Sequence, residues 1–269
     1  MNNDIWAEPK NVTSADDCYF YHTMDIPTHG IVNGEWDLRG REAAYLGNTG
    51  LAGKRVLEVG PASGHLCFAM EKMGASVVSY DLSDKQQWDV VPYAGYDMKL
   101  YIAQRKNHIR RLNNGYWFAH RAFGSSAKVV YGSVYDIPDN IGTFDVCTFG
   151  SVLLHLRDPF LALQRVLAHV QETVIVTDVA SGLGFRAFVY KMMTAVETLT
   201  GARRVSFLPN AKELSPLDTW WILTPRVVAE FLQILGFAET TISFHRQQNK
   251  SREVLLYTVV GRRKAAGTS

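Results

Sequence analysis

The sequence predicts an α/β fold with a mostly parallel, seven-stranded sheet, helices on both of its faces and an antiparallel hairpin at its C-terminal end. Short hydrophobic runs rich in β-branched residues recur along the chain, and segments of helical periodicity separate the first five. That alternation is typical of β-α-β units, whose strands are covered on both faces and read as continuous hydrophobic runs. The last two runs have no helix between them and predict the hairpin. The seven runs are residues 55–59, 76–80, 127–131, 143–149, 173–177, 240–245 and 253–260.

Four segments are predicted to be helices, in chain order 38–46, Gly64 to about Met73, 158–170 and 226–236. The third has the clearest pattern, because Phe160, Leu163 and Val166 recur at helical spacing and share one face. Gly236 is placed to close the fourth, since glycine readily adopts the left-handed conformation found at many helix ends.

Length and composition indicate one large domain that needs no covalent or metal cross-link. The chain has 269 residues, of which 47% are hydrophobic and 20% charged, which is ordinary for a globular protein. Its net charge of +2 is too small to attract the protein as a whole to nucleic acid or to an anionic membrane. The three cysteines, Cys18, Cys67 and Cys147, are scattered without metal-ligand spacing, so we expect neither disulfides nor a metal site.

No targeting or membrane segment is expected. The first ten residues carry Asp4 and Glu8 but no apolar run, which a secretory signal requires. No stretch reaches the ~18 apolar residues of a membrane span. We therefore expect a cytoplasmic protein that does not contact a membrane.

Changes in composition divide the chain into regions. Residues 1–52 are rich in aromatic residues and interrupted by glycine and proline, and we expect them to form an N-terminal cap. The main domain spans residues 53–261 and carries two additions. One is an insertion at 85–126, after the second predicted strand, and the other is a lid-like segment at 183–220. Residues 262–269 are expected to form a flexible tail.

The loop after the first predicted strand is the most informative stretch. Glu58 and Val59 lead into Gly60-Pro61-Ala62-Ser63-Gly64, so a strand ends in glycine and a helix opens within a few residues. Gly60 permits a tight turn, and Gly64 lets a ligand approach the backbone without a Cβ in the way. The free N–H groups at the helix start favour an anion or an electron-rich group. In open parallel sheets, ligands bind at the carboxyl ends of the strands, where this loop lies.

The glycine spacing distinguishes two kinds of nucleotide ligand. A dinucleotide fingerprint starting at Gly60 requires glycine at position 62 and glycine or alanine at position 65, where this chain has Ala62 and His65. An NAD-dependent oxidoreductase is therefore disfavoured. Asp81 ends the second strand about 20 residues beyond Gly60, where a carboxylate can accept two hydrogen bonds from a ribose diol.

These residues resemble the class I S-adenosylmethionine-dependent methyltransferases, whose first motif is an acidic residue followed by x-G-x-x-x-G. The resemblance covers roughly residues 50–182 and implies a Rossmann-like fold with S-adenosyl-L-methionine as the cofactor. Glu58 would lie near the methionine amino group, and Asp81 would hold the ribose hydroxyls. The cofactor site that the resemblance implies consists of Glu58, Gly60, Pro61, Ala62, Gly64, Asp81, Leu82, Ser133, Val134 and Ser151.

Two later segments extend the resemblance. The run Tyr131-Gly132-Ser133-Val134 resembles the family's adenine loop, with Ser133 where an acidic residue often stands and Asp136 as a possible substitute. Residues 144–156 resemble the fourth strand and the turn after it, which faces both donor and acceptor.

His155, just beyond that strand, is the first candidate for a general base, which an acceptor hydroxyl or acidic carbon would need. The alternative is a histidine that satisfies a helix start or a core hydrogen bond. His22, His108 and His120 are weaker candidates.

A narrower similarity concerns three phrases: Gly34-Glu35-Trp36-Asp37, residues 144–159 and Trp220-Trp221-Ile222. They are similar to the branch that contains the bacterial tRNA wobble-uridine carboxymethyltransferase. The cationic residue that this branch uses for a carboxylated donor matches no motif here, so ordinary S-adenosylmethionine is the expected donor.

The insertion is basic and aromatic. Residues 98–128 contain no Asp or Glu but seven bases, interleaved with Tyr101, Tyr116, Trp117 and Phe118. Such a pattern can hold phosphates while rings stack, which would suit RNA or a phosphorylated small molecule. The alternative is a solvated basic helix whose aromatic residues pack on the sheet, and the small net charge favours it. The seven bases are Lys99, Arg105, Lys106, Arg110, Arg111, Arg121 and Lys128.

Aromatic residues of the cap, such as Phe20 and Tyr21, also have two interpretations. They could cover a sulfonium by cation–π attraction, or they could anchor the cap to the main domain.

The expected function is methyl transfer from S-adenosyl-L-methionine to a small-molecule acceptor. The alternatives are a tRNA or RNA base (carboxy)methyltransferase and a non-catalytic S-adenosylmethionine-binding protein.

Overall fold

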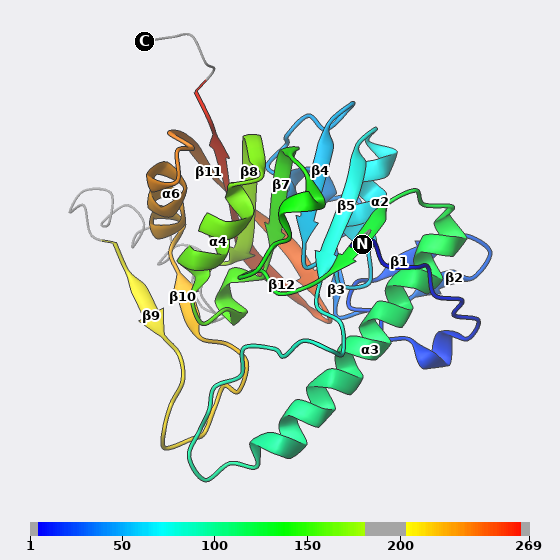
Figure 1. Ribbon diagram of the computed structural model, residues 1–269, viewed down its shortest axis with the longest axis horizontal. Coiled ribbons are helices and arrows are strands. Elements are labelled where there is room, and N and C mark those ends of the chain that lie inside the picture. The colour runs from blue at the N-terminus through cyan, green and yellow to red at the C-terminus, as the bar shows by residue number, and fades with distance from the viewer. Residues whose placement is uncertain (1–4, 181–202, 265–269) are drawn as a thin grey trace.

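The computed structural model describes residues 5–180 and 203–264, which are built around an eight-stranded sheet of order β3-β11-β12-β8-β7-β4-β5-β6 (Figure 1). The strands from β8 to β6 are parallel, whereas β12 runs antiparallel to both β8 and β11. The mostly parallel sheet and the C-terminal hairpin are therefore confirmed. The strands are β3 (Trp36–Asp37), β4 (Arg55–Val59), β5 (Ser76–Asp81), β6 (Lys128–Tyr131), β7 (Phe144–Gly150), β8 (Val170–Val179), β11 (Glu239–Asn249) and β12 (Arg252–Arg262).

The count of seven strands was wrong by one, because the predicted N-terminal cap contributes β3 to the sheet edge. β3 pairs with the end of β11. Because β3 is only two residues long, it leaves no hydrophobic pattern in the sequence. At the opposite edge, Trp6 forms a bridge with Val130 of β6, and the Ala7 N–H donates to the Val129 carbonyl at 2.8 Å. The N-terminal region therefore covers both edges of the sheet, which protects their unpaired backbone groups.

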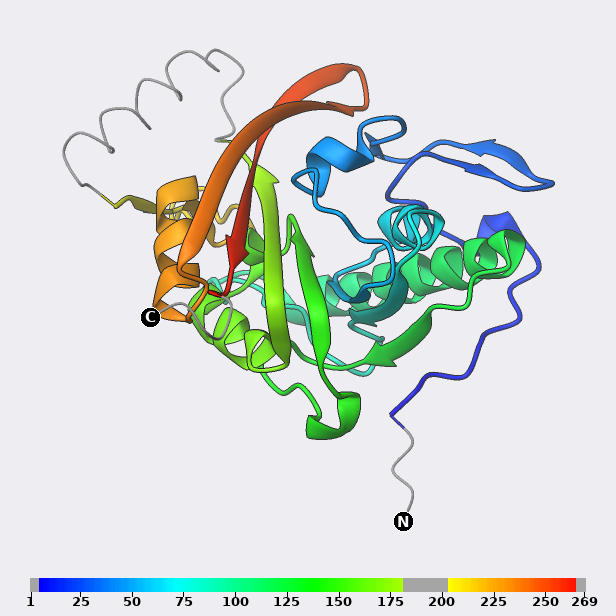
Figure 2. The same cartoon turned by 90° about the horizontal axis from the view of Figure 1, so that it is seen from above.

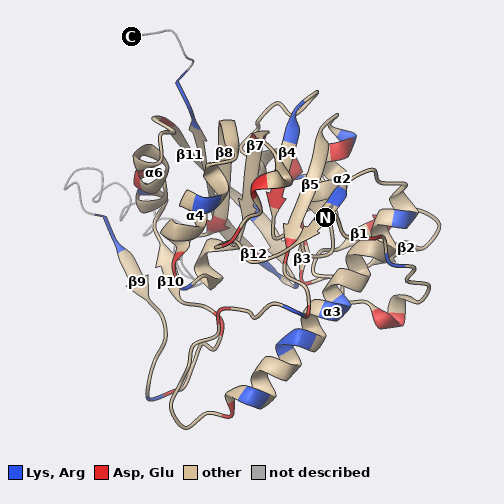
Figure 3. Ribbon diagram, viewed as in Figure 1, with Lys and Arg blue, Asp and Glu red and all other residues tan. Residues whose placement is uncertain are grey.

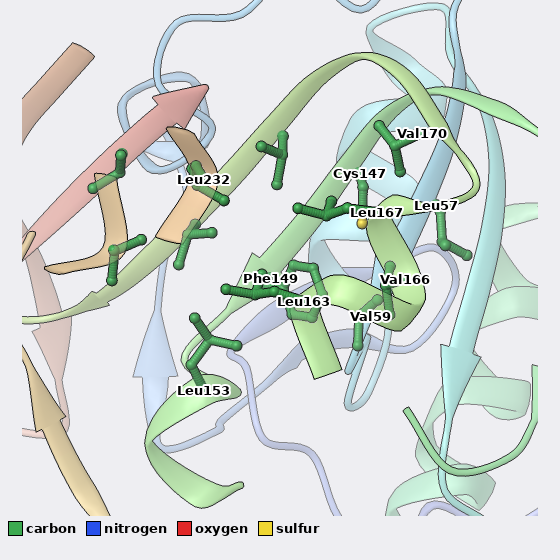
Figure 4. Close-up of a cluster of buried hydrophobic side chains, with 14 of the residues drawn as sticks. Leu57, Val59, Cys147, Phe149, Leu153, Leu163, Val166, Leu167, Val170 and Leu232 are labelled. Atoms are coloured by element: carbon green, nitrogen blue, oxygen red, sulfur yellow. The ribbon is translucent and has the colours of Figure 1, made fainter. Parts of the chain in front are cut away.

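Helices cover both faces of the sheet. Seen from above, α2 (His65–Lys72) and α3 (Met98–Phe123) lie on one side, and α4 (Pro159–Leu167) and α6 (Pro225–Ile234) on the other (Figure 2). Alternate residues of β4 reach the two resulting cores. Val56 packs with α2 and α3, whereas Leu57 packs with Leu163 and Val166 of α4 (Figure 4).

Three of the four predicted helices are present as α2, α4 and α6. The remaining one, at 38–46, is much shorter than predicted. The segment 38–46 forms only α1 (Glu42–Tyr45), because Gly40 and Gly47 take left-handed φ values of 74° and 62° on either side of it. The remaining short elements are η1 (Ala15–Asp17), β1 (Met24–Ile26), β2 (Gly30–Val32), η2 (Asp139–Ile141), η3 (Leu153–His155), β9 (Val205–Phe207) and β10 (Trp221–Leu223).

Two of the predicted regions lie at the C-terminal side of the chain. The lid-like segment 183–220 lies partly outside the described residues, and its described part contains β9 and the loop leading to β10. The chain is still held at Arg263, whose guanidinium donates to the carbonyls of Leu167 and Val170, so the predicted tail does not begin at residue 262. Among the described helices, none has the length and apolar character to cross a membrane.

Part of the predicted insertion forms α3, and three of its aromatic residues pack in the core, as the second interpretation predicted. Asp97 caps the helix by accepting a hydrogen bond from the Leu100 N–H at 3.1 Å, and Gly124 ends it at a φ of 61°. Tyr116, Trp117 and Phe118 of its last turns are buried in the core beneath α2 and α3.

The N-terminal chain is bound along α3. Arg111 donates to the carbonyls of Asp16 and Cys18 at 3.1 and 2.7 Å. Gly115 allows the closest approach, since a Cβ there would stand 2.6 Å from the Tyr19 carbonyl oxygen.

This close approach leads to a prediction for Gly115→Ala. Helix propensity alone favours alanine by about 1 kcal/mol, but the added methyl must displace the Tyr19 backbone, which we expect to cost about 1–3 kcal/mol. The net result should be a lower free energy of unfolding in urea. Gly50→Ala is the matched control, because a Cβ at Gly50 meets nothing within 4 Å. A Gly115→Ala protein as stable as the wild type would contradict this account.

Candidate functional site

A cavity of about 180 Å³ opens at the carboxyl ends of the parallel strands β4, β5, β6 and β7. This is the edge at which open α/β sheets bind ligands. The structure brings eight of the predicted site residues together in its lining. They are Gly60, Ala62, Asp81, Leu82, Ser133, Val134, Ser151 and His155.

The turn after β4 forms the floor of this cavity. Gly60 has a φ of 74°, and a Cβ there would lie 2.6 Å from the Val152 side chain, so glycine is needed for both conformation and space. Pro61 and Gly64 lie outside the lining of the cavity. At Gly64 a Cβ would come within 2.6 Å of the Phe68 ring, so its small size serves packing of the turn onto α2.

Two carboxyl groups stand beside this turn. Asp81 ends β5, where its Oδ1 accepts a hydrogen bond from the Leu82 N–H at 2.7 Å, and burial raises its pKa to about 7. Glu58 is buried in β4 with Ser79 Oγ at 3.4 Å from its Oε2. Burial and the negative charge of Asp81 raise the pKa of Glu58 to about 8. A positive group or hydrogen-bond donor entering here would stabilise both ionised forms.

Glu58 faces a second, smaller cavity behind the Gly60 turn. His22 and Tyr45, both from the N-terminal region, also line it. Burial lowers the pKa of His22 to about 3, so this imidazole is neutral at neutral pH. Glu58, the acidic residue of the predicted motif, therefore lines the smaller cavity, whereas Asp81 lines the larger one, and the Gly60 turn lies between them.

An apolar slot lies between the ends of β5 and β6. Leu82 and Val134 were predicted here, whereas Ile109 and Leu112 of α3 were not. Nothing in the sequence showed that these two residues would line a cavity. Asp136 was wrongly considered as a substitute for an acidic residue at Ser133, because its side chain is exposed and outside the cavity lining.

His155 lies in η3 at the other end of the cavity. Its Nδ1 is 2.6 Å from the main-chain carbonyl oxygen of Asp218. A carbonyl can only accept, so Nδ1 carries the proton and Nε2 holds the lone pair. Burial lowers the pKa of this imidazole, which keeps it neutral and able to accept a proton. The ring stands edge-on to Trp88, with centroids 5.7 Å apart.

Aromatic side chains from separate regions complete this end. Tyr21 comes from the N-terminal region, Trp88 from the segment before α3, and His108 from α3 itself. Trp88 gave no signal in the sequence, because only the fold brings it to His155. Among the cap aromatics, Tyr21 lines the cavity, whereas Phe20 packs near the buried Phe118 ring.

The basic residues of α3 follow one another along the helix (Figure 3). Three of the arginines bind other parts of the protein. Arg111 and Arg121 donate to carbonyl groups of the N-terminal chain, and Arg105 forms an ion pair with Asp218 at 3.1 Å. Their positive charge is therefore used largely to attach two segments to α3.

The described residues contain no group of three or more His, Cys, Asp or Glu side chains arranged to hold a metal ion. The main cavity instead offers the Gly60 turn, the Asp81 carboxyl with its raised pKa, a neutral imidazole with a free lone pair and aromatic faces, and the adjoining cavity offers the Glu58 carboxyl. Aromatic faces attract cations, and the carboxyls suit hydroxyl and ammonium groups. Such a set can bind a cationic nucleoside and receive a proton beside it.

Comparisons with known proteins agree with this description. A family model described as a methyltransferase domain matches residues 37–227. No curated protein matches the sequence. Among solved structures, a SAM-dependent methyltransferase from Methanosarcina mazei has a TM-score of 0.51 at 12% identity, over 84% of this chain and 98% of that chain. That likeness shows a shared fold.

Two other solved structures are similar at lower TM-scores. Magnesium protoporphyrin IX methyltransferase from Synechocystis PCC 6803, with bound SAH, gives 0.49 at 13% identity, over 83% of this chain and 80% of that chain. The 1,6-didemethyltoxoflavin-N1-methyltransferase from Burkholderia thailandensis, with bound 1,6-didemethyltoxoflavin and S-adenosylhomocysteine, gives 0.48 at 15% identity, over 85% and 78%.

The raised pKa of Asp81 predicts how stability depends on pH. The ordinary aspartate pKa is about 4, so between about pH 4 and pH 7 the folded state holds a proton that the unfolded state releases. Ionisation of Asp81 should therefore lower the free energy of unfolding as pH rises through this window, by at most about 1.4 kcal/mol per pH unit from this group. Asp81→Asn, which cannot ionise, should flatten this slope in urea unfolding measured from pH 5 to about pH 8.

The matched control is Asp25→Asn, which removes an exposed carboxylate on β1 and should leave the slope unchanged. An Asp81→Asn protein with the wild-type slope would show that Asp81 is already ionised in the folded protein.

Proposed function

Because the chain belongs to the methyltransferase domain family, we propose that it transfers the methyl group of S-adenosyl-L-methionine to a small-molecule acceptor. One observation carries the proposal: the Gly60 turn, the Asp81 carboxyl and the His155 imidazole line a single cavity. S-adenosylmethionine supplies a methyl group on a positively charged sulfur. The remaining chemistry is positioning of the donor and acceptor, together with removal of a proton where the acceptor carries one.

The donor side is assigned to residues at the strand ends. Asp81 accepts hydrogen bonds from the ribose hydroxyls, and Glu58 with the Gly60 turn serves the amino-acid arm. The apolar slot at Leu82, lined also by Ser133 and Val134, takes the adenine ring. Both carboxyls are held in low-polarity surroundings, so donor binding favours their ionised forms and releases protons.

The acceptor side lies between His155, Trp88 and Tyr21. A cavity with mostly apolar and aromatic walls, covered by side chains from three regions, suits a small molecule. The arginines most suited to RNA phosphates, Arg111 and Arg121, instead bind backbone carbonyls. This favours a small acceptor over the tRNA wobble-uridine alternative.

Donor binding gives the first test of the proposal. By isothermal titration calorimetry, S-adenosylmethionine and S-adenosylhomocysteine should bind and NAD should not. Asp81→Ala should weaken binding about 10- to 100-fold, since it removes hydrogen bonds to a charged acceptor. Asp136→Ala, at an exposed carboxylate outside the cavity, is the control and should bind normally. A wild-type protein that binds neither nucleoside would overturn the proposal.

Methyl transfer gives the second test. With methyl-labelled donor, label should enter the small-molecule fraction of a cell extract and not its RNA. His155→Gln should lower turnover about 10²- to 10⁴-fold, the usual effect of losing a general base, without changing donor affinity. His120→Gln is the control, because that imidazole bonds the Ala127 carbonyl outside the cavity. Donor binding without any labelled product would favour the non-catalytic alternative.

A further inference from the structure

Asp218 connects α3 to His155 through two different groups. Its main-chain carbonyl accepts the hydrogen bond from His155 Nδ1 at 2.6 Å. Its carboxylate Oδ2 accepts hydrogen bonds from the Tyr101 hydroxyl at 2.8 Å and from Arg105 Nη1 at 3.1 Å. Both donors belong to α3. The position of the carbonyl that orients His155 is therefore set by a helix far away in sequence.

The segment that carries Asp218 is held next to η3 from a second direction. The Trp220 N–H donates to the Leu154 carbonyl at 2.8 Å, and the Trp220 indole N–H donates to the Asp89 carbonyl at 2.8 Å. These bonds hold the loop before β10 against the backbone beside His155. The carbonyl of Asp218 thus has little freedom to move away from the imidazole.

Arg105 reaches His155 by a further route. Its guanidinium lies 5.5 Å from the centroid of the Trp88 ring, and that ring stands edge-on to the imidazole. Asp218 and Arg105 are the charged groups that act on His155, with opposite effects on its pKa. Neither produces a charged imidazole, because burial is the largest influence and lowers the pKa.

We propose that Asp218, held by Tyr101 and Arg105, is a positioning residue that fixes His155 in the Nδ1–H tautomer. Nε2 is then the atom that accepts a proton from the methyl acceptor. This inference rests on the proposed methyl transfer and adds the class of acceptor. The acceptor carries a hydroxyl or N–H group, whose proton must leave as the new bond forms.

The step balances without another reactant. An electron pair on the acceptor oxygen or nitrogen forms the bond to the methyl carbon while the carbon–sulfur bond breaks and its electrons remain on sulfur. The proton lost by the acceptor moves to His155 Nε2, and the imidazolium that results keeps its Nδ1–H bond to the Asp218 carbonyl. A thioether acceptor, which has no proton to lose, would not need this arrangement.

The proposal can be tested on the full-length protein, since nitrogen NMR of ¹⁵N-histidine-labelled protein reports the imidazole tautomer. The His155 signals are assigned by their loss in His155→Gln. Wild-type His155 should be in the Nδ1–H form. In Arg105→Gln that preference should fall roughly tenfold, because the Asp218 loop loses a charged partner, and the pH titration of the ring should shift both for this reason and because a nearby positive charge is lost. Tyr101→Phe should shift both in the same direction by a smaller amount.

The matched control is Arg110→Gln, an exposed arginine of the same helix whose side chain bonds Asn107. It makes the same charge change and should leave the His155 tautomer and titration unaltered. Wild-type signals in both Arg105→Gln and Tyr101→Phe would overturn the inference. The milder Tyr101→Phe keeps the test decisive if Arg105→Gln fails to fold.

Donor calorimetry on the same samples separates this inference from the proposed function. A wild-type protein that binds donor, with an Nδ1–H tautomer that the α3 variants do not disturb, overturns the role of Asp218 alone. A wild-type protein that binds no donor overturns the methyltransferase proposal, whatever the tautomer.

Discussion

The attachment of two distant segments to α3 is the physical constraint on which the cavity depends. Arg111 binds the backbone carbonyls just before Tyr21, and Arg105 binds the carboxylate of Asp218. Each interaction places a cavity wall, since Tyr21 lines the cavity and Asp218 orients His155. The helix adds Ile109 and Leu112 directly to the apolar slot. The helix α3, inserted between β5 and β6, therefore holds the other segments that line the cavity in place.

The sheet contributes a different constraint, because it holds two carboxyls where water has little access. Burial raises the pKa of both Glu58 and Asp81, and the negative charge of Asp81 adds to the effect on Glu58, so each carboxyl is less stable in its charged form than on the surface. A ligand with hydroxyl and ammonium groups reverses that effect. A sulfonium nucleoside bound as proposed would offset the electrostatic cost of charging these two carboxyls, which would link stability, pH and binding through the same two residues.

Local patterns in the sequence predicted the parts of the fold and site that depend on local structure. Strand runs, the Gly60 turn and Asp81 are each encoded within a few residues, and the structure places them as expected. Features that depend on tertiary contacts were missed. β3 is too short for any periodicity, and the contact between Trp88 and His155 joins two segments that are far apart in the sequence. The basic stretch was visible, but the backbone carbonyls that its arginines bind were not.

His155 shows why the structural and catalytic interpretations of a histidine need not compete. A hydrogen bond to a backbone carbonyl is what a purely structural histidine would make, and His155 makes one with Asp218. In a ring with two nitrogens, using Nδ1 as the donor leaves Nε2 as the acceptor. Because His155 also lines the cavity, the bond that fixes its position leaves Nε2 with the lone pair that the proposed methyl transfer would use. A single contact can therefore both stabilise the fold and set the tautomer that the proposed base requires.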